Sequence, residues 1–215
     1  MLTLFFAAGA SSMASHILLN ESELPFQLER VDLMKKTWAG GDYNAVNPKN
    51  YVPALRLDNG EILTEGAVIL SYIADLTSKK TLLARSGLER YRQLEWLNYI
   101  SMELHKNFIT PERHGGMSSN FLSKTHQGQR DTFVRVAPRL AFVDAILRGR
   151  SFLCGDIFTA PDAYLYVMCT WGRRLGFEMD AWPGLRAFAE RVADRPAVQK
   201  TVQVEGPAHS LHVQG

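Results

Sequence analysis

The chain has 215 residues, of which 46% are hydrophobic, and its formal net charge is +2 from 24 basic and 22 acidic side chains. This length can bury one sizeable core or two small ones, and no apolar run approaches the roughly 18 residues of a membrane span. The charges of both signs are interspersed and form no basic stripe, so neither a membrane nor a nucleic acid is an expected partner.

Cysteine usage indicates a reducing environment. Cys154 and Cys169 are too few for a disulfide framework and lack the spacing of metal ligands, so we expect buried thiols, no bound metal and a cytoplasmic location. The N-terminal run LTLFFAAGA has the small and apolar residues of a signal peptide, but no Lys or Arg precedes it. A first strand over residues 2–6 explains these residues better.

The first third of the chain predicts an α/β domain. The strand over 2–6 leads into the turn Gly9-Ala10-Ser11-Ser12, after which apolar residues recur at helical spacing. A second strand over 26–33 completes a strand–helix–strand unit whose strands should be parallel. With the hairpin and helix described next, residues 1–77 read βαβ-ββα, which predicts a thioredoxin-like sheet with helices on both faces.

The segment NPKNYVPALRLDNGEILTEG, at 47–66, is the most informative stretch of the chain. Pro53 stands where a strand begins, and we expect its peptide bond to be cis. Asp58-Asn59-Gly60 offers the left-handed backbone of a tight hairpin. Thr64-Glu65-Gly66 then opens an amphipathic helix whose free N–H groups can hold a carboxylate. The segment therefore predicts an anion site next to a strand.

After a linker over 78–87, residues 88–215 carry helical patterns without strand signals. Pro138 lies inside one of these patterns and predicts a kink or a helix start nearby. Thr159-Ala160-Pro161-Asp162 is typical of a capped helix start. The tail after Gly206 reads as surface coil. The expected helices cover 88–108, 127–148, 159–175 and 182–195, and a short last helix begins at Pro196.

Two segments resemble motifs of one family. NPKNYVPALRLDNGEILTEG and ERYRQLEWLNYISMELHK, at 89–106, are similar to the corresponding parts of cytosolic glutathione transferases, and most of all to those of the bacterial beta class. The resemblance extends over nearly the whole chain. It implies a thioredoxin-like glutathione-binding domain, an all-helical domain that contributes the electrophile site, and a homodimer. The implied activity is transfer of glutathione to small hydrophobic electrophiles, or their reduction by it.

The resemblance also implies which residues hold glutathione as co-substrate. It assigns the edge at Val52 and Pro53 to the cysteinyl part and Glu65 with Gly66 to the γ-glutamyl end, which suits a peptide that needs a strand edge and a carboxylate that needs a helix start. Lys35, or its neighbour Lys36, would meet the glycyl carboxylate. The remaining implied contacts are Ala10 in the first turn and, from the helical domain or a neighbouring subunit, Asn98 and Glu103.

The turn before the first helix is where a thiol could be activated. Glutathione supplies the nucleophile, so the protein needs only to stabilise the thiolate, and a hydroxyl beside the positive end of a helix can do so. Ser11 is the preferred donor and Ser12 its rival, although both could simply cap the helix. By resemblance, His105 could donate to the sulfur or to developing charge, whereas a lone histidine on a helix seldom takes part in catalysis.

The chain departs from the family at this turn. Beta-class members typically carry cysteine at the position of Ser11, so a mixed disulfide with glutathione is excluded there. Phe5 and Phe6 stand in the strand where other classes use a tyrosine. Two alternatives therefore remain beside the transferase: a noncatalytic binding or regulatory protein with the same fold, and a glutaredoxin-like thiol exchanger, which the missing cysteine disfavours.

The electrophile should meet apolar residues of the helical domain. Aromatic residues at helical spacing more often belong to the core than to a ligand site, so a core position is the alternative for each candidate. The residues that we expect at the electrophile site are Phe108, Ile109, Arg113, His114, Met117 and Trp171.

Overall fold

The computed structural model describes residues 1–79, 81–109 and 122–206. Within these residues the N-terminal part contains a four-stranded sheet with the strand order β2-β1-β5-β6. β1 (Leu2–Phe6) pairs in parallel with β2 (Phe26–Arg30) and antiparallel with β5 (Ala54–Arg56), which pairs with β6 (Ile62–Thr64). The predicted thioredoxin-like βαβ-ββα domain is therefore confirmed.

Alternating side chains of β1 pack on opposite faces of this sheet, as the twofold period of a strand requires. Leu4 and Phe6 belong to the main core, which they share with α1 (Ser12–Ser22) and α2 (Gly66–Leu76). Phe5 lies in a separate cluster on the other face, where its ring packs against Trp38 and Tyr43. These two residues belong to the segment β3 (Thr37–Trp38), β4 (Gly41–Asp42) and η1 (Tyr43–Ala45).

The second strand is shorter than the predicted 26–33. It ends at Arg30, and Asp32 then turns the chain by accepting hydrogen bonds from the backbone N–H groups of Met34 and Lys35. A short Asp side chain competes with the strand ladder in this way because it can bond its own local backbone. The segment after β2 is therefore a turn that leads into β3.

The rest of the described chain is helical, as predicted. α3 (Gly87–Tyr99) continues through a π-helix, η2 (Ile100–His105), into α4 (Lys106–Phe108). The other helices are α6 (His126–Leu147), α7 (Ala160–Arg174), the short η3 (Met179–Ala181), α8 (Pro183–Ala193) and α9 (Pro196–Glu205). No helix in the described ranges is long and apolar enough to cross a membrane.

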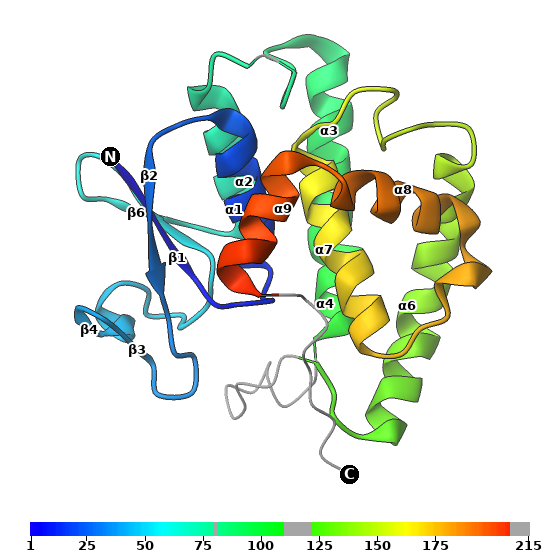
Figure 1. The fold of residues 1–215 in the computed structure, drawn as a ribbon, viewed down its shortest axis with the longest axis horizontal. Helices are drawn as coiled ribbons and strands as arrows, with labels where there is room; N and C mark the ends of the chain where they lie inside the picture. The colour runs from blue at the N-terminus through cyan, green and yellow to red at the C-terminus, as the bar shows by residue number, and fades with distance from the viewer. Residues whose placement is uncertain (80, 110–121, 207–215) are drawn as a thin grey trace.

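The two parts of the chain share an extensive contact. α1 packs against α2 on the sheet side and against α7 and α9 on the helical side, so α1 and α9 lie between the sheet and the helical bundle (Figure 1). α7 is buried along most of its length, from Ala160 to Gly172. Its start carries the predicted capping box, in which Asp162 accepts from the Thr159 N–H at 2.8 Å.

Two helix boundaries differ from the prediction. α6 begins at His126, one residue before the predicted start at 127, where the Thr125 hydroxyl accepts from the Gly128 N–H. It runs through Pro138, so of the two alternatives predicted there, a kink or a helix start, the helix start is wrong. Pro138 has no N–H group, so the carbonyl of Val134 loses its helical hydrogen bond. The helix tolerates this because both residues lie on its exposed face, where water can bond the carbonyl. α8 ends at Ala193 because Pro196 forces an extended backbone on Arg195. The tail beyond Gly206 lies outside the described residues.

Candidate active site

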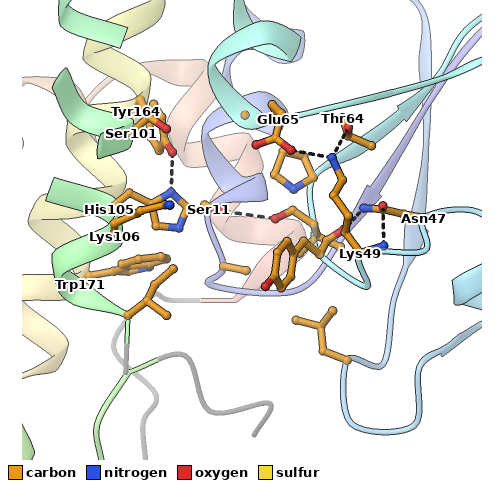
Figure 2. Close-up of a pocket in the computed structure, with 17 residues that line it drawn as sticks. Ser11, Asn47, Lys49, Thr64, Glu65, Ser101, His105, Lys106, Tyr164 and Trp171 are labelled. Carbon is orange, nitrogen blue, oxygen red and sulfur yellow. Dashed lines mark hydrogen bonds and ion pairs between the residues drawn. The ribbon is translucent and has the colours of Figure 1, made fainter. Parts of the chain in front are cut away.

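A cavity of about 220 Å³ lies between the sheet domain and the helical domain (Figure 2). One wall comes from the first turn, the strand edge before β5 and the start of α2. The other wall comes from η2, α4 and α7. The residues that line it are Ala10, Ser11, Leu33, Asn47, Lys49, Tyr51, Val52, Pro53, Thr64, Glu65, Gly66, Ser101, His105, Lys106, Ile109, Tyr164 and Trp171.

Ser11 lies at the floor of the cavity and is 7% exposed. Its hydroxyl donates to the carbonyl oxygen of Val52 at 3.2 Å and makes no capping bond to α1. Ser12 is fully buried, and its hydroxyl is within bonding distance of both the N–H and the carbonyl of Ala7. Ser11 is therefore the hydroxyl that the cavity can use, and Ser12 closes the turn behind it.

The strand edge beside Ser11 is held in place by buried polar groups. The peptide bond between Val52 and Pro53 is cis, as predicted. The carbonyl of Tyr51 accepts hydrogen bonds from the Tyr43 hydroxyl and from the amide of Asn47, each at 2.8 Å. Burial raises the pKa of Tyr43 to about 12, so its phenol stays protonated and remains a donor. These two hydrogen bonds hold the backbone that presents Val52 to the cavity.

The start of α2 carries a charged pair. The Lys49 ammonium group donates to the Glu65 carboxylate at 2.6 Å and to the Thr64 hydroxyl at 2.7 Å. Glu65 has a φ of 70°, a backbone conformation that side-chain-bearing residues rarely adopt, and it stands directly before the first free N–H groups of α2. A carboxylate ligand could bond these N–H groups while Glu65 meets a cationic group.

The helical wall is built around His105. Its Nδ1 atom lies 2.5 Å from the Tyr164 hydroxyl, and its ring packs edge-on against Trp171 with the centroids 5.0 Å apart. The Trp171 Nε1–H donates at 3.0 Å to the carbonyl of Gly9 in the first turn. The same carbonyl accepts from Arg174 at 2.7 Å. The helical domain therefore holds the turn that carries Ser11.

Many of the predicted site residues meet in this cavity. The first turn, the strand edge and the start of α2 contribute Ala10, Ser11, Val52, Pro53, Glu65 and Gly66, and the helical domain contributes His105, Ile109 and Trp171. Arg113, His114 and Met117 lie outside the described residues.

Other predicted residues do not line it. Lys35 has a side chain that is 78% exposed, with its ammonium 3.9 Å from Asp32, and Lys36 is exposed in the same turn. Both side chains are exposed, so neither lysine lines the cavity, although Leu33 of the same segment does. Phe108 is fully buried and stacks on Phe177, so it belongs to the core.

The two α3–η2 residues assigned to glutathione also lie away from the cavity. Glu103 is bound to Arg139 of α6 at 2.8 Å, because it lies on the side of the helix that faces α6. Asn98 is exposed on α3. Neither residue lines the cavity of this chain.

Several lining residues were not predicted. Asn47, Lys49, Tyr51 and Thr64 belong to the segment 47–66 and lie beside predicted residues, and Lys106 follows His105 directly. Leu33, Ser101 and Tyr164 reach the cavity only through tertiary packing. Tyr164 lies two residues after the capping box of α7.

The two-domain fold agrees with comparisons to known proteins. Profiles described as "Glutathione S-transferase, N-terminal domain" and "Glutathione S-transferase, C-terminal domain" match residues 11–76 and 101–196. Glutathione S-transferase GstA of Escherichia coli O157:H7 is 42% identical over 206 residues, which cover 94% of this chain and 98% of that protein.

Solved structures give the same result. A sphingomonad glutathione S-transferase complexed with glutathione has a TM-score of 0.84 at 38% identity and covers 95% of this chain and 98% of its own. A beta-class enzyme of Sphingomonas chungbukensis also has a TM-score of 0.84, at 36% identity, with the same coverage of 95% and 98%. The chain therefore belongs to the glutathione S-transferase family, close to its bacterial beta class. It is a glutathione transferase enzyme, as the motif resemblance implied.

Proposed function

We propose that this cavity binds glutathione, that Ser11 and the start of α1 stabilise its thiolate, and that the thiolate is transferred to a small hydrophobic electrophile. The observation that carries the proposal is the Ser11 hydroxyl at the cavity floor, beside the Val52 carbonyl. A cysteinyl residue paired with the Val52 backbone would bring its sulfur to this hydroxyl.

The rest of the peptide fits the same wall. The γ-glutamyl carboxylate would bond the N–H groups at the start of α2, and its ammonium group would meet Glu65. Lys106 would take the place of Lys35 and Lys36 as the partner for the glycyl carboxylate, because it borders the cavity and Lys49 is bound to Glu65 at the γ-glutamyl end. A related sphingomonad glutathione S-transferase forms a complex with glutathione, which supports glutathione as the ligand of this cavity.

Thiolate stabilisation at Ser11 combines two effects. The positive end of the α1 dipole favours a negative charge in the first turn. The Ser11 hydroxyl would turn from Val52 toward the sulfur and donate a hydrogen bond to the charged form. Since Ser11 is largely buried, water competes weakly for that bond.

Transfer is favoured over reduction through a protein thiol. A mixed disulfide needs a cysteine beside the bound sulfur, and both Cys154 and Cys169 lie outside the cavity lining. Burial raises the pKa of each of these thiols to about 12, so their thiolate forms are scarce. Both thiols are free, which supports the proposed cytoplasmic location.

The electrophile would bind on the helical side of the sulfur. Ile109 and Trp171 supply apolar surface, and His105 supplies a polar group next to it. An aromatic or alkyl halide of modest size suits this combination. The proposed division of the chain follows from it: residues 1–77 bind glutathione, 78–87 connect, and 88–215 contribute the electrophile side.

We also propose a homodimer. Large apolar side chains are exposed on neighbouring helices: Tyr91 of α3 is 68% exposed, Met102 of η2 is 50% exposed and Phe142 of α6 is 50% exposed. Phe142 extends an aromatic cluster with Trp96 and Tyr99. Apolar surface of this kind is typical of an interface between subunits. Light scattering at micromolar concentration tests it, and a mass of 24.2 kDa for the native protein would contradict it.

One experiment tests the proposed function as a whole. The native protein is titrated with glutathione by calorimetry and then incubated with glutathione and a generic aryl halide, and the product is identified by mass spectrometry. We expect saturable binding and a thioether conjugate of glutathione. No heat of binding at millimolar glutathione, or a product that is only glutathione disulfide, would contradict the proposal.

A further inference from the structure

The contact between His105 and Tyr164 joins two elements of the helical wall. His105 ends the π-helix η2, and Tyr164 lies in the first half of α7, where it is 2% exposed. Their side chains meet at 2.5 Å between Nδ1 and the phenolic oxygen, and both line the cavity (Figure 2). A π-helix is rare and is often found at functional sites, so its position here singles out these residues.

The direction of this hydrogen bond follows from the surroundings of Tyr164. Burial raises the pKa of the phenol well above its ordinary value, so the hydroxyl keeps its hydrogen. Within the described residues, Nδ1 of His105 is the hydrogen-bond partner of the Tyr164 hydroxyl, and a buried O–H group left without an acceptor would cost free energy. Tyr164 therefore donates its hydrogen to Nδ1 of His105.

An accepting Nδ1 decides where the imidazole carries its proton. In a neutral histidine one ring nitrogen accepts and the other bears the hydrogen, and the bond made by the first fixes the second. His105 would therefore carry its hydrogen on Nε2. The ring is held in this orientation by edge-on packing against Tyr164 and Trp171, with interplanar angles of 81° and 79°.

We propose that Tyr164 is a positioning residue that keeps His105 as the neutral Nε2–H tautomer, so that His105 offers a donor to the sulfur or to charge that develops during transfer. The role of this donor rests on the proposed function. The opposite tautomer would present a lone pair from Nε2, and a lone pair repels a thiolate. One buried hydroxyl thus decides whether the histidine stabilises or opposes the reacting charge.

Nitrogen-15 NMR tests the tautomer without any assay of activity. The chain has 6 histidines, and His105→Gln identifies the resonances of His105 by their loss. In the native protein we expect coupling and chemical shifts of the Nε2–H tautomer, and in Tyr164→Phe a shift toward a mixture of tautomers. Tyr166→Phe, on the same helix and outside the cavity lining, is the matched control and should leave the signals unchanged. An Nδ1–H tautomer in the native protein, or an unchanged tautomer in Tyr164→Phe, would overturn the proposal.

Kinetics then separate positioning from a structural effect. Tyr164→Phe should lower kcat about three- to tenfold, the scale of one neutral hydrogen bond, while the KM for glutathione stays within about twofold. In the His105→Gln background the same change should have no further effect, because its target is gone. Additive losses in the double variant would overturn the proposal, whereas an inactive native protein with the Nε2–H tautomer would contradict the proposed function alone.

Discussion

The Ser11 hydroxyl donates a hydrogen bond to the Val52 carbonyl across 3.2 Å, and so joins the turn before α1 to the strand edge before β5. Both groups face the same cavity. In the proposed complex the backbone at Val52 pairs with the cysteinyl residue and the hydroxyl turns to its sulfur. The bond thus holds a hydroxyl donor in the cavity, where it can bond the sulfur of glutathione. Ser11 is therefore the first residue to test.

Ser11→Ala should lower turnover with a generic aryl halide about ten- to a thousandfold, the scale of one hydrogen bond to a charge. Affinity for glutathione should change little, because the strand edge and the start of α2 remain. Steady-state kinetics and calorimetry measure the two effects separately. Ser12→Ala is the control: it should reduce stability, since its hydroxyl is bonded within the turn at Ala7. Full activity in Ser11→Ala would transfer the role to His105 or to backbone amides.

Ser11→Cys should restore the thiol that beta-class relatives carry at this position. A thiol at the start of α1 has a lowered pKa and lies beside the proposed glutathione sulfur, so it should form a mixed disulfide with oxidised glutathione. Mass spectrometry of the intact protein detects this adduct. The native protein should remain unmodified under the same conditions, because burial raises the pKa of its two thiols to about 12. An adduct on the native protein would contradict this account of its cysteines.

Replacement of Glu65 by Ala should weaken glutathione binding about tenfold or more, on the scale of a charge-assisted hydrogen bond. Lys49→Met should also weaken binding, because Lys49 holds Glu65 at 2.6 Å and borders the cavity. Lys35→Met is the matched control and should bind normally, since its side chain is 78% exposed outside the lining. Calorimetry compares the three variants. Loss of binding in Lys35→Met alone would restore the original assignment of that lysine.

Asp162 should make stability depend on pH. Burial raises its pKa from 3.8 to about 6 in the folded state, so between these values the folded protein binds the proton more tightly than the unfolded chain. The free energy of unfolding should therefore fall as the pH rises through this window. Asp162→Asn cannot titrate, although it loses one acceptor for Thr159 and should be about 1–3 kcal/mol less stable. Urea unfolding at several pH values measures the free energy of unfolding of both proteins. The difference between native protein and variant should become smaller as the pH rises to 6, and a constant difference would contradict the raised pKa of Asp162.

The sequence segment 47–66 predicted its own structure well. The cis Val52-Pro53 bond, the hairpin and the start of α2 depend on local residues, and Asp58-Asn59-Gly60 can form little else than a turn. The capping box at Thr159 and Asp162 was predicted correctly for the same reason, because it too depends on residues close together in the sequence. Strong local signals of this kind need no knowledge of the packing.

The helical wall could be predicted only in part. His105 was found through its motif, but its contact with Tyr164 joins residues 59 positions apart, and nothing in the intervening sequence indicates it. The places of Lys35 and Lys36 could not be predicted for a similar reason: both are exposed in the turn at Asp32 and do not line the cavity. Whether a lysine lines a cavity depends on how its loop is placed in the folded chain. The local sequence does not predict that placement.

The most direct test of the account is a titration of the thiol of bound glutathione, followed by the ultraviolet absorbance of its thiolate against pH. We expect the bound thiol to ionise at a pKa near neutrality, below the roughly 8.5 of an ordinary thiol, and Ser11→Ala to raise that pKa by about one to two units. A bound thiol that ionises at its ordinary pKa, or the same lowered pKa in Ser11→Ala, would contradict thiolate stabilisation by Ser11.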